Sequence, residues 1–489
     1  MEEIVEKQPV VVVLGHIDSG KTSLLMAIKD FGVLEKESGG ITQHLGAYEI
    51  EYSGKKITFI DTPGHEAFSQ MRSRGAKVAD LAILVLDTTK GVQEQTKEAI
   101  SLIKQVKIPT IVALNKIDRI DSQVKKTELE LEKYGIVTER RGGEVPAVEV
   151  SAKTKQGIED LLEMIVLVSQ IQNLKANLNQ KAKGVVIESF LDPKKGPLAT
   201  IIVEDGVLKE GDFFVTESSS GKIKRIENFL GQRIEKVYPG GVGIIFGFPE
   251  PLMVGEKLEV VDEIKEIKRE KKQFLPEEEK EEVKDKKILP ILLKSDCQGS
   301  LEATKEVLMR LPNDKVKIKI LAQGIGNFNE NDIYLAREKK AFLVGFRVDL
   351  TKTAKILLKR EGLKFFNFEV IYDLIEGIRK LMEKVLEPEI IRIDLGKGKV
   401  LVIFFTQGSR QIIGVRILEG KVERGAKIEV IRGEEKIGQG KIINLQKERK
   451  DIVFAGKGEE VGILYEGNVK IKEGDEVLFF KEERKKVEI

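Results

Sequence analysis

Apolar and polar positions alternate along this chain in successive, distinct patterns. From Val10 to about residue 178, short apolar runs alternate with segments of helical periodicity. Runs such as KKITFI, LAILVLD and PTIVALN are typical of buried parallel strands, whereas AFSQMRSRGAKVAD, QTKEAISLIKQV and GIEDLLEMIVLVSQI fit helices. The alternation predicts a doubly wound, mostly parallel sheet with helices on both faces over residues 1–178.

Two later stretches have the pattern of β-barrels. Short β-rich runs are broken by Gly, Pro and Asp over 182–262, and the segment 389–489 is β-rich throughout. DGVLKEGD at 205–212 aligns without gaps to EGKVERGA at 419–426. Homology and a recurring glycine turn between unrelated hairpins explain this repeat equally well. Both explanations predict two barrels.

Between the barrels the pattern changes twice. Residues 263–287 contain nine basic and nine acidic residues and few apolar ones, so we expect an exposed, charged linker without a core. Strands and helices alternate again over 288–388, which predicts an α/β/α sandwich. The sandwich lacks a cluster of acid, base and nucleophile that would indicate a second active site. We therefore expect it to be a rigid element that transmits conformational change between the first domain and the C-terminal segment. The predicted fold class is therefore multidomain α/β plus β.

The amino-acid composition limits the class of protein and the compartment in which it is expected. The 489 residues are 41% apolar and 33% charged, enough for several separate cores in a soluble protein. Because 82 basic residues face 80 acidic ones, any nucleic-acid contact must be local. The single cysteine, Cys297, excludes an intramolecular disulfide, is expected to be a small buried hydrophobe, and indicates a cytoplasmic address. The polar N-terminus and the lack of a long apolar run predict neither export nor membrane insertion, and we expect a monomer.

The first apolar run leads into a phosphate-loop motif. GHIDSGKT fits the pattern of Gly15, four residues, Gly20, Lys21 and Thr22. Lys21 can reach the terminal phosphates of a nucleotide and the Thr22 hydroxyl can bind Mg²⁺. Backbone amides and the following helix N-terminus can cradle the phosphates. The predicted phosphate-binding residues are Gly15, His16, Ile17, Asp18, Ser19, Gly20, Lys21 and Thr22.

Two further segments predict a nucleotide-state switch. In DTPGH, which follows a predicted strand, Asp61 can hold Mg²⁺ through water and the Gly64 amide can sense a γ-phosphate. In GGITQHLG, the Thr42 hydroxyl could complete the Mg²⁺ shell only when that phosphate is present. His65 is the predicted catalytic residue, because its imidazole could orient the attacking water. The other two histidines, His16 and His44, are expected to serve local loop structure. Since the sequence contains no obvious arginine finger, we expect slow intrinsic hydrolysis and a stimulus supplied in trans.

The base-binding signals follow two more predicted strands. In NKID, the Asp118 carboxylate can accept two hydrogen bonds from guanine, and adenine would leave a buried Asp118 unpaired. Lys116 can lie along the purine face, and Asn115 can tie the base loop to the phosphate loop. Ser151, Ala152 and Lys153 can place a backbone N–H near the guanine O6. Four such motifs in this order predict a GTP site.

Several of these segments resemble one known family. GHIDSGKT, GGITQHLGAY, DTPGHEAFSQMRSRGA, NKID and SAK are similar to the GTPase domain of bacterial translation initiation factor two, and SDCQGSLEA and VIYDLIEGIRKLMEKVLEPE extend the likeness along the chain. The resemblance implies ribosome-stimulated GTP hydrolysis and initiator formylmethionyl-tRNA placement on the small ribosomal subunit. It also implies subunit joining and contacts with other initiation factors.

The resemblance carries roles to particular residues as well. Ile17 and Ile41 match the apolar pair that flanks the catalytic histidine, and Asp18 matches a residue that helps a monovalent cation bind. Ser19 stands where a histidine is usual, and we expect nucleotide binding to survive because the cradle is mostly backbone. The family commonly has a long N-terminal extension. This chain begins almost at the phosphate loop, so we expect the contacts of such an extension to be absent.

The last barrel holds the formylmethionyl end of initiator tRNA in the family. Val415 and Val461 stand where that family has cysteines, and Glu448 stands where it has an aromatic residue. A small apolar pocket could persist at the two valines, but a carboxylate is unfavourable beside RNA. A GTP-dependent ribosome-binding switch without initiator-tRNA recognition is therefore the alternative hypothesis. A solvated face explains the candidate rim residues equally well; they are Lys447, Arg449, Lys450 and Glu460.

An elongation-type factor that delivers aminoacyl-tRNA is a third hypothesis. The α/β segment at 288–388 and the long helical run that follows it argue against this class.

Overall fold

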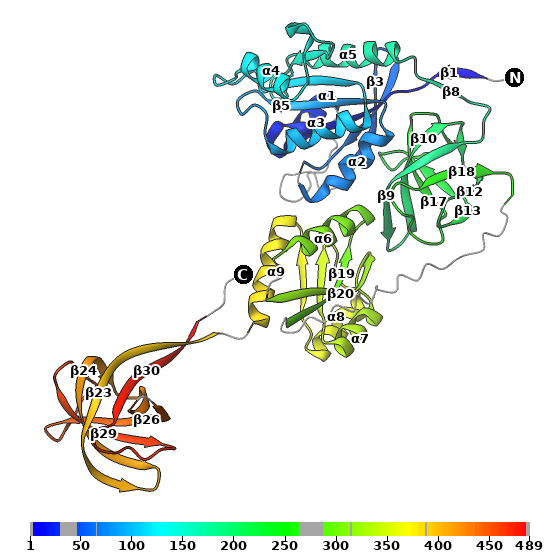
Figure 1. The fold of residues 1–489 in the computed structure, drawn as a ribbon. Coiled ribbons are helices and arrows are strands. Elements are labelled where there is room, and N and C mark those ends of the chain that lie inside the picture. Colours follow the sequence, from blue (N-terminus) through cyan, green and yellow to red (C-terminus); the bar gives the residue numbers. More distant parts are fainter. Residues whose placement is uncertain are drawn as a thin grey trace. The chain divides into compact units, whose positions relative to one another are not determined.

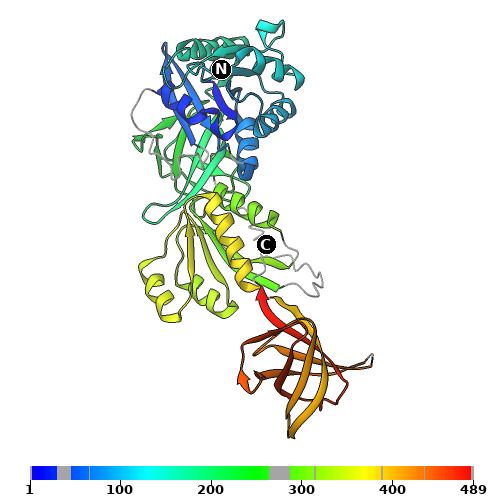
Figure 2. The same ribbon diagram turned by 90° about the vertical axis from the view of Figure 1, so that its left-hand side faces the viewer.

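A computed structural model describes residues 3–29, 46–64, 66–263, 287–312, 315–386, 389–433 and 435–485. The chain forms two compact units, Met1–Leu381 and Met382–Ile489, and each is described by itself. Figures 1 and 2 show the elements of both units in two views. Within the described part of the chain, no helix is long and apolar enough to cross a membrane.

The first unit begins with the predicted doubly wound sheet, in the strand order β3-β4-β2-β5-β6-β7. Every residue of β2 and β5 is buried, which explains their unbroken apolar runs. All neighbours pair in parallel except β3 and β4. The strands are β2 (Val10–Gly15), β3 (Gly46–Tyr52), β4 (Lys55–Asp61), β5 (Leu81–Asp87), β6 (Thr110–Asn115) and β7 (Ala147–Glu149). The helices are α1 (Lys21–Lys29), α2 (Ser69–Val78), α3 (Glu94–Val106), α4 (Val124–Lys133) and α5 (Ile158–Ile171).

A short ribbon that the sequence did not predict joins the two ends of this domain. The strand β1 (Ile4–Glu6) pairs antiparallel with β8 (Lys175–Asn177), and Val5 lies opposite Ala176. The polar N-terminal sequence has too few apolar positions to indicate a strand on its own.

The second part of the first unit is the predicted first barrel, an antiparallel sheet in the order β13-β12-β18-β9-β10-β17-β14-β15. It wraps around a core that includes Ile201, Phe214 and Ile245. Gly206 and Gly420, which the sequence repeat aligned, both have positive φ angles, 70° and 68°. The strands are β9 (Lys183–Asp192), β10 (Gly196–Asp205), β11 (Leu208–Lys209), β12 (Phe213–Val215), β13 (Ser220–Lys222), β14 (Arg225–Glu227), β15 (Arg233–Ile234), β16 (Lys236–Val237), β17 (Val242–Phe246) and β18 (Lys257–Val261).

The predicted sandwich follows as a parallel sheet in the order β20-β19-β21-β22. Figure 2 shows α9 lying across one face of this sheet, and α7 packs on α8. Residues 264–286 of the predicted linker lie outside the described residues. The elements are β19 (Lys287–Ser295), α6 (Gln298–Arg310), β20 (Val316–Ile325), α7 (Glu330–Lys339), β21 (Phe342–Phe346), α8 (Lys352–Glu361), β22 (Phe365–Phe368) and α9 (Ile371–Val385).

The N-terminus of α6 joins the three parts of the first unit. The Gly299 N–H donates to Glu188 Oε1 of β9 at 3.1 Å, and Arg74 of α2 pairs with Glu302 of α6 at 2.5 Å. A Cβ atom on Gly299 would lie only 2.4 Å from the Met71 side chain, so glycine permits this close packing. Cys297 is buried as predicted, and its sulfur also accepts the Ser300 N–H at the start of α6.

The second unit is the predicted second barrel. Because β23 pairs with both β30 and β24, the order β23-β30-β25-β26-β29-β24 closes on itself. Buried Glu429 of β25 accepts hydrogen bonds from Arg392 at 3.0 Å and Gln439 at 2.9 Å. These bonds, Arg392 first, lower the pKa of Glu429 to about 2 despite its burial. The strands are β23 (Glu389–Gln407), β24 (Arg410–Glu423), β25 (Lys427–Arg432), β26 (Glu435–Lys447), β27 (Lys450–Asp451), β28 (Phe454–Gly456), β29 (Glu460–Gly467) and β30 (Glu476–Lys485).

Candidate functional site

The predicted phosphate loop lies at the carboxyl end of β2, between that strand and α1. Gly15 has a φ of 144°, and a Cβ atom there would lie 2.4 Å from the Val85 carbonyl oxygen. Gly20 has a φ of 89°, and its Cβ atom would lie 2.5 Å from the Asn115 side chain. Glycine is therefore required at both ends of the loop by backbone conformation and by space. Ile17–Ser19 form a 3₁₀ turn between them.

Lys21 is buried at the start of α1 and bonds to the loop itself. Its Nζ donates to the Gly15 carbonyl at 2.9 Å and to the His16 carbonyl at 2.7 Å. Burial of the ammonium lowers the pKa of Lys21 to about 8, although the Asp61 carboxylate opposes this shift. A phosphate at the loop would supply stronger, charged acceptors for the same ammonium and restore its ordinary pKa.

His16 contributes through its backbone, which matches its predicted role in loop structure. Its carbonyl accepts the Ser19 N–H at 3.2 Å and the Ser19 hydroxyl at 2.8 Å, which closes the turn. Burial lowers the pKa of the His16 imidazole, and Lys21 nearby opposes its protonation as well. The side chain at position 19 therefore stabilises the loop from within.

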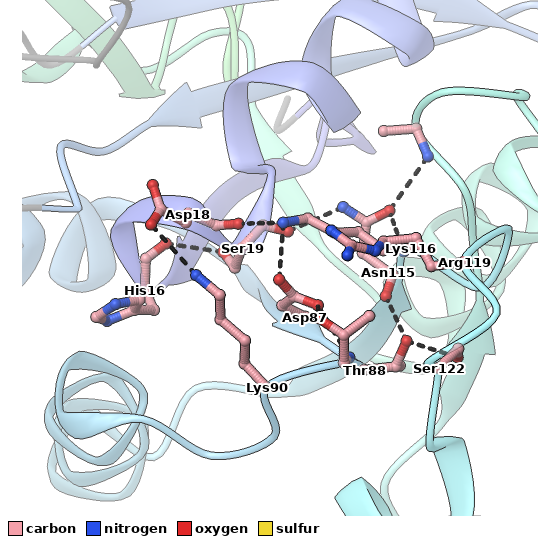
Figure 3. Close-up of polar contacts among 12 residues, drawn as sticks. His16, Asp18, Ser19, Asp87, Thr88, Lys90, Asn115, Lys116, Arg119 and Ser122 are labelled. Atoms are coloured by element: carbon pink, nitrogen blue, oxygen red, sulfur yellow. Dashed lines mark hydrogen bonds and ion pairs between the residues drawn. The ribbon is translucent and has the colours of Figure 1, made fainter.

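Asn115 ties the base loop to the phosphate loop, as the sequence predicted. Its Nδ2 donates to the Ser19 carbonyl at 2.9 Å, while its Oδ1 accepts the amides of Lys116 at 2.8 Å and Ala152 at 3.1 Å. Asn115 is 1% exposed, so each bond replaces one to water. One side chain thus joins three loops (Figure 3).

Lys116 is stretched beside the phosphate loop, consistent with its predicted place along a purine face. Its Nζ donates to the Asp18 carbonyl at 2.6 Å and to Asp87 Oδ2 at 2.7 Å (Figure 3). Burial alone would raise the pKa of Asp87, but hydrogen bonds from Lys116 and Thr89 outweigh it and lower the pKa. Asp87 ends the strand β5, so the strand-end rule that found Asn115 could also have found it.

Asp118 lies in the base loop, where its side chain is exposed and one of its two carboxylate oxygens accepts a hydrogen bond. Its Oδ1 accepts the buried Ser151 hydroxyl at 2.7 Å, and this bond lowers the pKa of Asp118. The expectation of a buried Asp118 is wrong, because this side chain is exposed in the loop that follows β6. Lys153 is also exposed, one residue beyond Ala152. Desolvation of the Asp118 carboxylate would therefore come from a base that covers it.

The switch residues are described only in part. Asp61 ends β4 in register with Val13, so its carboxylate lies beside the phosphate loop. A Cβ atom on Gly64 would lie 2.6 Å from Lys21 Nζ and 2.8 Å from the Ile17 Cα, so this segment packs directly on the loop. The predictions for Thr42 and His65, and those for Ile41 and His44, fall outside the described residues.

Two contacts to these loops come from residues that the sequence did not single out. Gln95 of α3 accepts the Ile17 N–H at 2.9 Å. Arg72 of α2 is only 2% exposed and donates to the Pro63 carbonyl at 3.1 Å. Both are polar residues on helices with ordinary amphipathic patterns, so no local signal marks them.

The residues expected at a tRNA site lie in the second unit and fall into two groups. Val415 and Val461 lie opposite one another on β24 and β29, and both are buried in the barrel core. The expectation that these valines line an accessible pocket is wrong, because alternation along both strands turns them inward. Glu460 pairs with Arg416 at 2.5 Å, and Lys447 pairs with Glu459 at 2.6 Å. Glu448 and Arg449 form the positive-φ turn before Lys450, and both Arg449 and Lys450 are exposed.

An exposed apolar patch lies on the outer face of this barrel, which we call the glycine-floored patch. Phe404 of β23 is 67% exposed, and a Cβ atom on Gly414 would lie 3.1 Å from its ring. Gly414 pairs with Gly462, and Ile412 pairs with Leu464 beside them. Two glycines facing one another lower the surface beside an aromatic ring. The sequence signal, a phenylalanine in a strand that also contains core residues, was not specific enough to find the patch.

The fold and these loops define the first domain as the guanine-nucleotide-binding domain of a translation factor. Residues 6–170 match the model of the elongation factor Tu GTP binding domain, and residues 264–379 match that of translation-initiation factor 2. Residues 181–261 match elongation factor G domain 2, and 396–478 match elongation factor Tu domain 4.

Two relatives are both described as translation initiation factor IF-2. The protein of Carboxydothermus hydrogenoformans is 40% identical over 98% of this chain and 60% of its own length. That of Clostridium botulinum (strain Hall) is 41% identical over 99% of this chain and 73% of its own length. The chain belongs to the translation initiation factor IF-2 family. The chain is also similar to the protein in the crystal structure of GDP-bound aIF5B from Aeropyrum pernix, with 26% identity over 97% of this chain and 92% of that chain and a TM-score of 0.46.

Proposed function

We propose that this chain is a GTPase of translation initiation. In this proposal it binds GTP and Mg²⁺ through the first domain and hydrolyses GTP when ribosomal subunits join. It also places initiator formylmethionyl-tRNA on the small subunit and works with other initiation factors. The observation that carries the proposal is the Asn115 side chain, whose three hydrogen bonds hold the base loop against the phosphate loop.

The geometry of the base loop supports the proposal that the bound base is guanine. Ser151 occupies one oxygen of Asp118 and orients the carboxylate, which leaves acceptor capacity for the ring N–H and the exocyclic amine of guanine. A base packed over this exposed carboxylate would remove water from it. Adenine, which lacks that donor pair, would then leave a desolvated carboxylate unpaired.

The residues beside the phosphate loop suit Mg²⁺. The Thr22 hydroxyl and the Asp61 carboxylate are oxygen donors of the kind that Mg²⁺ prefers together with phosphate oxygens, and Thr42 is the proposed further ligand. When bound, the ion would neutralise charge that develops on the phosphates. Asp18 is the candidate for a monovalent cation, which would compete with the Lys90 ammonium 3.4 Å away.

Turnover of GTP with and without ribosomes tests the hydrolysis proposal. We expect ribosomes to raise the turnover number and His65→Ala to abolish most of that increase, because the imidazole would no longer orient water. The matched control is His44→Ala, which removes the same imidazole from a residue with an expected structural role. Turnover that ribosomes do not raise, or that His65→Ala leaves intact, would remove the mechanism.

For tRNA, we propose that the methionyl end packs on the glycine-floored patch, with Arg449 and Lys450 near the RNA backbone. A flexible thioether side chain packs well against an aromatic ring. A GTP-dependent ribosome-binding switch without tRNA recognition is the other candidate. This candidate was based on the residues at positions 415, 461 and 448. Val415 and Val461 no longer support it, because both are core residues of the barrel. Glu448 remains a carboxylate in an exposed turn and keeps this candidate open.

Affinity of the full chain for formylated and unformylated methionyl-tRNA distinguishes these two functions. We expect a preference for the formylated form, which Phe404→Ala reduces by about tenfold, as loss of a buried aromatic contact would. Phe454→Ala is the control, since Phe454 is equally exposed, at 66%, but lies on β28, where it pairs with Glu423 at the last position of β24. No preference in the unmodified chain would favour the switch without tRNA recognition.

A further inference from the structure

We propose that Gln95 and Glu98, on one face of α3, are positioning residues for GTP hydrolysis. They hold the two backbone segments beside the phosphate site against one another. The chemical consequence rests on the proposed function, whereas the geometry stands by itself.

The first segment is the phosphate loop at Ile17. The Ile17 N–H donates to Gln95 Oε1 at 2.9 Å, and Gln95 is half-buried near the start of α3. A hydrogen bond to a backbone amide fixes the orientation of the whole peptide plane. Gln95 therefore sets the direction in which the loop enters Asp18 and the 3₁₀ turn.

The second segment is the backbone that leads to the catalytic histidine position. Glu98 follows Gln95 by three residues and so lies on the same helix face. Its Oε1 accepts Arg72 Nη2 at 2.6 Å, and Arg72 Nη1 donates to the Pro63 carbonyl at 3.1 Å. Because Arg72 is only 2% exposed, its guanidinium cannot readily exchange these partners for water. Glu98 thus holds Pro63 through a single buried side chain.

These two segments touch each other. A Cβ atom on Gly64 would lie 2.8 Å from the Ile17 Cα and 3.1 Å from the Ile17 nitrogen, so the backbones are in direct contact. One helix therefore fixes both sides of the contact, Ile17 through Gln95 and Pro63–Gly64 through Glu98. Gly64 directly precedes His65, so a shift on either side would displace the backbone that enters the catalytic residue. Displacements of about 1 Å near reacting groups cost rates of about a hundredfold in other enzymes.

Substitutions at Gln95 separate an acceptor role from a packing role. Gln95→Leu keeps the size but removes the acceptor, and we expect ribosome-stimulated turnover to fall about tenfold, equivalent to about 1.4 kcal/mol. Gln95→Glu keeps an acceptor and should retain most of the turnover. Affinity for a fluorescent GDP analogue should fall much less than turnover, by no more than about threefold in both variants, since Lys21 keeps its own bonds to the phosphate loop and the base loop is untouched. Gln105→Leu, on an exposed position of the same helix, is the control.

Amide hydrogen exchange tests the geometry without any turnover. We expect Gln95→Leu to speed exchange across 16–20, and Glu98→Ala to speed it across 61–68, with little change elsewhere. If the unmodified chain shows no ribosome-stimulated hydrolysis, the proposed function fails. The positioning by α3 is overturned separately, if Gln95→Leu and Glu98→Ala leave hydrogen exchange in these segments unchanged. If the unmodified chain hydrolyses GTP and Gln95→Leu hydrolyses it equally fast, the positioning role is overturned whatever the exchange shows.

Discussion

Removing the Asn115 side chain is the most informative change at the nucleotide site. Asn115→Ala would leave three backbone groups without their partner, namely the Ser19 carbonyl and the amides of Lys116 and Ala152. A buried polar group left unpaired costs roughly 1–3 kcal/mol. Ser19 is buried, whereas Lys116 and Ala152 are half-buried and can recover part of the loss from water, so the lower end of this range applies. We expect the first domain to lose about 3 kcal/mol of unfolding free energy.

A second variant separates stability from nucleotide binding. Asn115→Asp keeps the oxygen that accepts two amides but places a carboxylate oxygen against the Ser19 carbonyl, where the present distance is 2.9 Å. We expect it to cost about 1–2 kcal/mol of stability. Its affinity for GDP should nevertheless fall at least tenfold, as in Asn115→Ala, because both variants detach the base loop from the phosphate loop.

Two assays on the full chain give these quantities. Hydrogen exchange across a urea series reports unfolding of peptides from the first domain separately from the rest of the chain. Titration with a fluorescent GDP analogue reports affinity. If Asn115→Asp bound GDP within about threefold of the unmodified chain, the bond to Ser19 would not be what joins the loops, and our account of the site would be refuted.

Three further changes test other parts of the structure. Asp118→Asn should weaken GDP binding at least a hundredfold and favour xanthosine diphosphate in competition titrations, because the new amide donates where guanine also donates. The lowered pKa of Glu429 contributes up to about 3 kcal/mol of stability above pH 5 that disappears as the pH falls towards 2; calorimetry should show this loss in the unmodified chain and not in Glu429→Gln. Gly299→Ala should cost about 1–3 kcal/mol by overpacking against Met71, whereas Gly456→Ala, with open space around its Cβ, should be nearly neutral in thermal unfolding.

Much of the nucleotide site followed from one rule, that ligands bind at the carboxyl ends of parallel strands. Apolar runs located the strands, so the polar residues after them, including Lys21, Asp61 and Asn115, could be predicted to lie together. Registers such as Val13 beside Asp61 then confirm the adjacency.

Contacts that depend on side-chain direction could not be predicted in this way. Gln95 and Arg72 reach the loops from helices whose sequence pattern marks only a buried and a solvated face. Val415 and Val461 lie on strands whose pairing register the sequence does not specify. A shift of that register by one residue would have turned both side chains outward. The exposed position of Asp118 depends on the path of the loop that follows β6, which no periodicity specifies.

The ribbon between β1 and β8 has a consequence for synthesis of the chain. Residues Ile4–Glu6 find their partners only at Lys175–Asn177, so β1 must wait for nearly the whole first domain to be made. At typical elongation rates of about 5–20 residues per second, that delay is on the order of ten to thirty seconds. The phosphate loop follows β1 by only a few residues, and its strand pairs earlier with β4 and β5. We therefore expect a nascent chain to form its nucleotide pocket before β1 and β8 pair and join the two ends of the first domain.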